Sequence, residues 1–297
     1  MEKIRQYYID CKRRGYRAKE PVVAALFRCD DMNELETQLR QAKVLSIPSI
    51  AFGKMDEKNE RCIVDFANKR LGGGWLSSGQ VQEEIMFTER FDVGALCARA
   101  LTEMPEDPVK TPVACKFSMH ANEAWVIKGC PRFAHLPWYG RVKEGFINKL
   151  TLLDPSEDKD TCPTIICVDA IKASFERYSR THLLLMLRKA YCGFAAAAHD
   201  PDVGGQKVVA TGSWGCGAFM NNECVMFVVQ ALAANAAGVT LTHHVLGDGK
   251  RLAPAFAFLE DVMLKKLTVL EVLDALAEKC ENDNVWRTKY DPSKERN

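Results

Sequence analysis

The sequence has no excess of charge of either sign, because Lys and Arg number 40 and Asp and Glu number 39. A protein that coats DNA carries a basic excess, so we expect no direct DNA binding, although a local basic groove for a polyanion stays open. No run approaches 18 uninterrupted apolar residues, and the charges scattered through residues 1–17 are not typical of a signal peptide. We therefore expect no association with a membrane.

The 12 cysteines include no C-x-x-C pair and no spacing typical of a zinc site. Four of them lie inside apolar runs: Cys62, Cys115, Cys167 and Cys224. Cysteines in such runs are usually free, buried thiols of a reducing compartment. The adjacent pair His243 and His244 would point to opposite faces of a strand, which disfavours a metal site there. We therefore expect no metal, no cofactor, and a nuclear or cytoplasmic location or both.

Short apolar runs alternate with helical patterns, which predicts a layered α/β fold. The expected strands are 46–52, 61–66, 113–117, 124–129, 164–170, 207–212 and 239–247. The expected helices are 4–11, 32–42, 183–198, 224–238, 252–267 and a last one that opens with the capping box of Thr268 and Glu271. We expect one monomeric domain over residues 1–297, with a helical lead-in over 1–45 and a poorly ordered polar tail over 281–297.

Asp65 and Asn68 follow an expected buried strand, at the position where open α/β sheets place ligand sites. One interpretation is structural: Asp65 begins a turn and Asn68 caps a helix. The other is that both side chains point into a cleft and contact the hydroxyls of a ribose.

The stretch GGGWLSSGQVQEEIMF, residues 72–87, joins three glycines to the carboxyls of Glu83 and Glu84. Consecutive glutamates usually lie on a solvated helix face, but these are flanked by Val81 and by the apolar residues 85–87. In an apolar setting the pKa of a carboxyl rises, and a neighbouring carboxylate raises the pKa of one of the two further. A carboxyl that keeps its proton at neutral pH is the acid that a glycosidic leaving oxygen needs.

The loop ATGSWGCGAFMNN, residues 210–222, follows another expected strand and carries glycines at 212, 215 and 217. Successive N–H groups of such a loop, helped by the following helix, form a site for an anion. No Gly-Lys-Ser/Thr follows, so the loop is suited to holding a diphosphate rather than transferring a phosphoryl group. Trp214 and Phe219 either stack on a base or ribose, or are buried aromatic residues of a tight turn.

These segments together resemble the poly(ADP-ribose) glycohydrolases, a family with a macrodomain fold. The family signature, three glycines followed after a short spacer by Gln-Glu-Glu, is matched by 72–74 and 82–84. Further blocks similar to those of the family are VDFAN (64–68), CVDAI (167–171), KAYCGF (189–194) and ATGSWGCGAF (210–219). The resemblance covers most of the chain and implies an α/β fold with a macrodomain-like mixed central sheet and helices on both faces.

The resemblance also implies hydrolysis of the ribose–ribose O-glycosidic bonds of poly(ADP-ribose), which releases ADP-ribose. Glu84 would act as general acid and base, Glu83 would orient the ribose, and Asp65 would support them as a third catalytic residue. The residues expected to bind substrate are Asn68, Gly73, Gly74, Gln82, Tyr139, Gly212, Ser213, Trp214, Gly215, Cys216, Gly217, Ala218 and Phe219. The expected partners are poly(ADP-ribose) and ADP-ribosylated proteins, as in the DNA damage response.

The chain departs from the family pattern in two places. Leu246 precedes Gly247-Asp248 where the family usually carries an aromatic residue, and residues 220–222 read Met-Asn-Asn where Gly-Gly-Asp is common. About 45 residues precede the first expected strand, which indicates a compact form without a large accessory domain. Three alternatives stay open: a macrodomain that binds ADP-ribose without cutting it, an enzyme that removes single ADP-ribose groups from proteins, and a structural or partner-binding domain.

Overall fold

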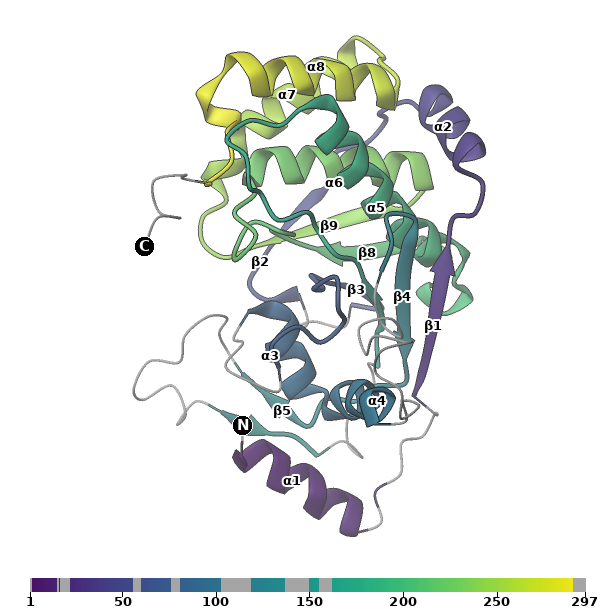
Figure 1. Ribbon diagram of the computed structural model, residues 1–297, viewed down its shortest axis with the longest axis vertical. Coiled ribbons are helices and arrows are strands. Elements are labelled where there is room, and N and C mark those ends of the chain that lie inside the picture. The colour runs from purple at the N-terminus through teal and green to yellow at the C-terminus, as the bar shows by residue number, and fades with distance from the viewer. Residues whose placement is uncertain are drawn as a thin grey trace, which may run out of the picture.

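The computed structural model describes residues 2–14, 16, 22–55, 60–75, 81–102, 119–136, 150–154 and 162–290. At its centre lies a seven-stranded mixed sheet with the order β1-β4-β7-β3-β8-β9-β2 (Figure 1). Its strands are β1 (Val23–Arg28), β2 (Ser49–Phe52), β3 (Cys62–Asp65), β4 (Glu123–Lys128), β7 (Thr164–Cys167), β8 (Val208–Thr211) and β9 (Thr240–Val245). β1, β4 and β7 pair antiparallel, whereas β7, β3, β8, β9 and β2 pair parallel. A second, two-stranded sheet consists of β5 (Ala134–His135) and β6 (Thr151–Leu152).

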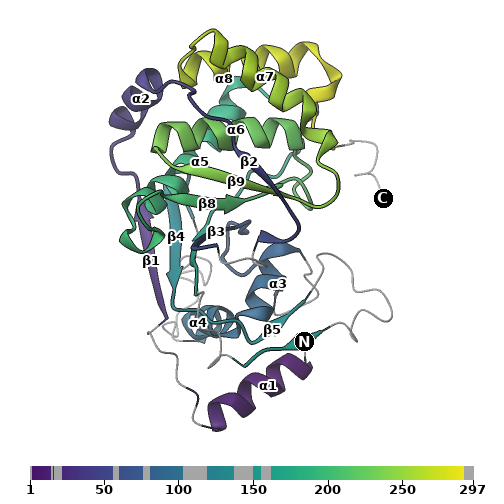
Figure 2. The ribbon, with the colours of Figure 1, turned by 180° about the vertical axis from the view of Figure 1, so that it is seen from behind.

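Helices cover both faces of the large sheet (Figures 1 and 2). The described helices are α1 (Glu2–Arg13), α2 (Met32–Gln41), α3 (Gln82–Glu89), α4 (Phe91–Thr102), α5 (Arg180–His199), α6 (Glu223–Ala237), α7 (Ala253–Leu264) and α8 (Val269–Asn282). α5 and α6 pack on one face, with α7 and α8 in a further layer, and α3 and α4 lie on the opposite face. The α/β class and the mixed sheet with helices on both faces are therefore confirmed. No helix of the described ranges is long and apolar enough to cross a membrane.

The main hydrophobic core lies between the sheet and α5 and α6, and residues 224–234 of α6 are all buried. α6 begins and ends at predicted signals: the side chain of Asn222 caps its first N–H groups, and Gly238 ends it in the left-handed conformation. In α5, a β-carbon on Gly193 would lie 2.3 Å from Cγ2 of Val168. This glycine therefore lets α5 approach the chain at the end of β7.

Two expectations about the ends of the chain are wrong. Residues 1–45 are not purely helical, because 23–28 forms the edge strand β1, which pairs with β4 along its whole length. Its side chains do not alternate strictly between buried and exposed, so the pattern that identifies a half-buried strand is missing. At the other end, Trp286 is 2% exposed and packs edge-on against Phe258, so residues 283–290 are part of the packed structure. The expected strand 113–117 lies outside the described residues.

Candidate active site at the carboxyl ends of the parallel strands

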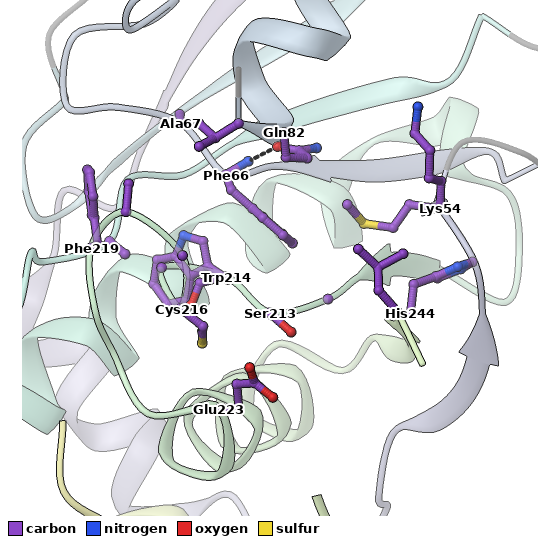
Figure 3. Close-up of a pocket in the computed structure, with 18 of the residues that line it drawn as sticks. Lys54, Phe66, Ala67, Gln82, Ser213, Trp214, Cys216, Phe219, Glu223 and His244 are labelled. Atoms are coloured by element: carbon purple, nitrogen blue, oxygen red, sulfur yellow. Dashed lines mark hydrogen bonds between the residues drawn. The ribbon is translucent and has the colours of Figure 1, made fainter. Parts of the chain in front are cut away.

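A pocket of about 450 Å³ lies at the carboxyl ends of the parallel strands, the usual place for a ligand in an open α/β sheet. Its wall is formed by the chain after β2, β3, β8 and β9, by the starts of α3 and α6, by the short helix η5 (Lys250–Leu252) and by the C-terminal segment. Figure 3 shows Phe66 and Gln82 on one side of the pocket and Ser213, Cys216 and Glu223 on the other. The segments around Asp65, Glu83 and the 210–222 loop thus meet in one region, as predicted.

Glu83 is bound by the main chain of two segments. Its Oε2 accepts a hydrogen bond from the N–H of Asn68 at 2.9 Å, and its Oε1 accepts one from the N–H of Gly72 at 2.6 Å. The residue is 1% exposed. Burial raises the pKa of Glu83 well above its usual value, and the charge of Asp65 adds to this rise, whereas the two N–H groups oppose it. A carboxyl with a raised pKa, which the apolar setting of the pair predicts, is therefore present at Glu83.

Glu84 lies one residue further along the first turn of α3. Its Oε1 accepts a hydrogen bond from the N–H of Gly74 at 3.1 Å, and its Oε2 accepts one from the N–H of Val81 at 2.9 Å. Glu84 is 7% exposed; it does not itself line the pocket, but Gln82 and Val81, two and three residues before it, do. The glutamate pair is therefore not a solvated helix face, because each carboxyl is held by N–H groups of the glycine run or its neighbours.

The glycine at position 73 is required by the closeness of the two carboxyls. Gly73 has φ +46°, and a β-carbon built on it would lie 2.6 Å from Oε2 of Glu83 and 2.8 Å from Oε1 of Glu84. Both distances are shorter than any normal contact, so a side chain at position 73 would displace the carboxyls. The glycine run thus serves to wrap the backbone around two buried acids.

Asp65 and Gln82 stand at the end of the central strand β3. Asp65 is fully buried; burial raises its pKa to about 8, the thiol of Cys167 opposes this rise, and the charge of Glu84 adds to it. Gln82 accepts a hydrogen bond from the N–H of Phe66 at 2.8 Å and donates one to the carbonyl of Val64 at 3.1 Å. Gln82 therefore fastens the start of α3 to the end of β3. Asp65 forms a third buried acid behind the glutamate pair.

The second half of the loop between β8 and α6 has main-chain N–H groups that are available to an anion. The N–H groups of Trp214 and Cys216 are used inside the loop, by the carbonyls of Gly212 and Ser213. The N–H groups of residues 217–219 donate no hydrogen bond to any other described residue, and the space beside Gly217 is open within 4 Å of where a β-carbon would lie. An anion would therefore be held by the main chain of 217–219, next to the N-terminus of α6.

The two aromatic residues of this loop have different environments. Trp214 is 2% exposed, and its Nε1–H donates to the carbonyl of Val168 at 2.9 Å, so the indole holds the loop against the sheet and has no free face for a base. Phe219 is partly exposed and lines the pocket, so its ring is accessible for stacking on a ligand. Two glycines of the loop are required for different reasons. A β-carbon on Gly212 would lie 2.9 Å from the carbonyl oxygen of His244, and Gly215 has a φ of +70°, a backbone conformation that favours glycine.

The structure also accounts for the two blocks CVDAI and KAYCGF. Asp169 of the first and Lys189 of the second form a buried ion pair with an Oδ1–Nζ distance of 2.6 Å. These blocks therefore support the sheet end beside the pocket. Asn68 contributes its main-chain N–H to Glu83, whereas Tyr139 lies outside the described residues.

Several pocket residues are absent from the sequence-based prediction. They are Gly53, Lys54, Met55, Phe66, Ala67, Val81, Ala170, Glu223, His244, Leu246, Arg251 and Lys289. Most of them belong to no recognisable motif, and they reach the pocket only because of the order in which the strands assemble. One of them, Lys54, is buried and forms an ion pair with Glu89 at 3.1 Å, which ties the chain after β2 to the last turn of α3. Among the described residues no group of three His, Cys, Asp or Glu side chains is placed to hold a metal ion.

Comparison with known proteins agrees with this arrangement. The family model of poly(ADP-ribose) glycohydrolase (PARG), macro domain fold, matches residues 29–252. Poly(ADP-ribose) glycohydrolase 1 of Caenorhabditis elegans is 26% identical over 272 residues, which are 84% of this chain and 32% of that protein. Poly(ADP-ribose) glycohydrolase 1 of Arabidopsis thaliana is 33% identical over 149 residues, which are 48% of this chain and 24% of that protein. The chain thus spans less than half the length of these relatives.

Among solved structures, that of poly(ADP-ribose) glycohydrolase from Thermomonospora curvata matches with a TM-score of 0.48 and 18% identity, over 87% of this chain and 97% of that chain. The family model extends from the end of β1 to η5 and so includes the glycine run, the glutamate pair and the loop between β8 and α6. From this match, the chain belongs to the poly(ADP-ribose) glycohydrolase family and has its macrodomain fold.

Proposed function

We propose that this protein hydrolyses the ribose–ribose O-glycosidic bonds of poly(ADP-ribose) and releases ADP-ribose. The observation that supports this most is the position of Glu84, at the start of α3, beside the pocket whose other side is the loop with the three available N–H groups. Two buried acids that need a glycine to fit are expected where an acid takes part in the reaction. The expected substrates include ADP-ribosylated proteins that carry the polymer.

In the proposed reaction, the diphosphate of one ADP-ribose unit binds to the main chain of residues 217–219. Glu83 binds the hydroxyls of the ribose whose bond is cut, which is compatible with its two N–H contacts because a carboxyl group, protonated or ionised, keeps further hydrogen-bonding positions beside them. Glu84 donates a proton to the leaving ribose oxygen as C1″ becomes oxocarbenium-like. The ionised Glu84 then takes a proton from the water that attacks C1″, which restores the acid. General acid–base catalysis of this kind contributes about 10²–10⁴-fold to the rate.

The test is Glu84→Gln, which keeps the shape of the side chain and removes its acid. We expect near-complete loss of ADP-ribose release from labelled poly(ADP-ribose), with the affinity for ADP-ribose retained in calorimetry. Glu278→Gln, on the exposed side of α8, is the matched control and should behave as the wild type. Turnover by Glu84→Gln near the wild-type rate would contradict the assigned role of Glu84.

One observation favours a second candidate, a macrodomain that binds ADP-ribose without cutting it. The carboxyl of Glu84 already accepts two main-chain hydrogen bonds and is 7% exposed, as a purely structural acid would be. Wild-type protein that binds ADP-ribose but releases none from the polymer would establish this candidate. A parallel assay on mono-ADP-ribosylated protein tests whether the bond next to the protein is also cut.

A further inference from the structure

The chain after α8 lies across the loop between β8 and α6. The short helix η6 (Asn284–Trp286) anchors it through the buried Trp286. The main-chain N–H of Lys289 then donates to the carbonyl of Met220 at 2.8 Å, and that of Thr288 donates to the carbonyl of Glu176 at 3.0 Å. These bonds fix Lys289 at the wall of the pocket.

Three charged side chains from separate parts of the chain meet at this wall, and we call them the cationic cluster. Oε1 of Glu223, the first residue of α6, lies 3.1 Å from Nη1 of Arg251 and 3.2 Å from Nζ of Lys289. Nζ of Lys289 also donates to the carbonyl of Cys216, in the loop itself, at 3.1 Å. Figure 3 shows Glu223 beside Cys216 on the pocket side of α6. All three members of the cluster line the pocket.

The cluster combines two positive charges with one negative charge. The carboxylate of Glu223 alone would repel a diphosphate bound to the loop, but the two cations bring the net charge of the cluster to +1. An ammonium has three donors and a guanidinium has five, so the contacts with Glu223 and Cys216 leave donors on both cations. The side chains of Arg251 and Lys289 are 65% and 50% exposed, whereas that of Glu223 is 15% exposed. The cations therefore face outward from a carboxylate that positions them.

We propose that Arg251 and Lys289 bind the phosphate oxygens of the substrate directly, with Glu223 as the residue that positions them. The main-chain N–H groups of 217–219 and the cationic cluster then contact one diphosphate from two sides. This proposal rests on the proposed function, because it assigns the anion of that same pocket. In this proposal, charged side chains contribute to diphosphate binding beside the main-chain N–H groups, and the affinity for ADP-ribose therefore depends strongly on salt.

The experiment measures the dissociation constant of ADP-ribose by calorimetry at low and at high salt for the wild type and five variants. Lys289→Gln and Arg251→Gln should each weaken binding about tenfold at low salt, the usual loss for one charge-assisted hydrogen bond, and less at high salt because ions screen the contact. Lys289→Arg keeps the charge and should bind within about twofold of the wild type. Lys265→Gln, which changes an exposed, ion-paired lysine directly after α7, is the charge-matched control.

Glu223→Gln separates this proposal from a structural role, because the two predict opposite signs. If the cluster binds the anion, Glu223→Gln strengthens ADP-ribose binding about threefold at low salt, because the amide oxygen still accepts from both cations and so keeps them in position while one repulsive charge is lost. If the cluster only closes the loop, Glu223→Gln weakens binding as much as Lys289→Gln does, at every salt concentration, and the proposal is overturned. Melting temperatures of all variants check that each one is folded.

Two further outcomes are decisive. Wild-type affinity and salt dependence in Lys289→Gln and Arg251→Gln would overturn this inference alone, provided that the wild type binds ADP-ribose and cuts the polymer. A wild type that neither binds ADP-ribose nor cuts the polymer would overturn the proposed function, and the assignment of the cationic cluster with it.

Discussion

Substitution of Gly73 by alanine tests whether the glycine run exists to enclose the two acids. The new β-carbon would lie 2.6 Å from Oε2 of Glu83 and 2.8 Å from Oε1 of Glu84, so both carboxyls must move by several tenths of an ångström. These are the oxygens that accept from Asn68 at 2.9 Å and from Gly74 at 3.1 Å, so the movement weakens both hydrogen bonds.

The expected loss of stability follows from these contacts. A non-glycine residue in the left-handed region costs about 1–2 kcal/mol, and a weakened hydrogen bond to a buried charged group costs about 1.5–3 kcal/mol. We therefore expect the free energy of unfolding to fall by about 2.5–5 kcal/mol, which many domains survive. A displacement of about 1 Å at a catalytic group can reduce turnover by about 10²-fold, so the smaller displacement in Gly73→Ala should leave the variant folded, with turnover reduced by up to about 10²-fold.

Urea unfolding gives the first quantity, and release of ADP-ribose from labelled polymer, well below the melting temperature, gives the second. Gly205→Ala is the matched control, because its β-carbon would meet nothing within 4 Å and its φ is not positive. The control should stay within about 0.5 kcal/mol of the wild type. A Gly73→Ala variant as stable and as active as Gly205→Ala would refute the reasoning.

Four further predictions follow. The pKa of Asp65 is raised to about 8 in the folded protein, so between about pH 4 and pH 8 its carboxyl binds more protons in the folded than in the unfolded state. Its contribution to the stability of the fold is therefore present below about pH 4 and is lost as the pH rises to 8. Asp65→Asn should flatten the resulting fall in melting temperature over that range. Trp214→Phe leaves the buried carbonyl of Val168 without its donor and should cost about 1–3 kcal/mol in urea unfolding. Phe219→Ala should weaken ADP-ribose binding in calorimetry while the melting temperature stays close to that of the wild type, and equal affinity would exclude stacking by this side chain. Thr268→Ala removes the cap of α8 and should cost about 1 kcal/mol in urea unfolding without any change in ADP-ribose affinity.

Elements with strong local signals were predictable. The capping box of Thr268 and Glu271 opens α8, and Gly238 ends α6, because caps depend on residues only a few positions apart. The buried parallel strands were also predictable, since strands covered on both faces are apolar throughout.

Elements without a periodic pattern were not predictable. All eight residues of α3 are buried, polar and apolar alike, so the polar residues do not mark an exposed face and the sequence shows no helical period. The edge strand β1 lacks a regular alternation. In both cases the surroundings, rather than the segment itself, decide which side chains are covered.

The sequence by itself determined the types of residue at the site: a glycine run, consecutive acids and a glycine-rich loop, each in a segment that follows an apolar strand. Only the tertiary structure decided which acids have a raised pKa, since the burial of Asp65 and Glu83 depends on the layers around them. Only the tertiary structure decided that the side chain of Trp214 is buried in the core and that Lys289 contacts Glu223, 66 positions away in the chain. Contacts at such separations depend on how the strands are ordered in the sheet, and no local pattern of residues records that order.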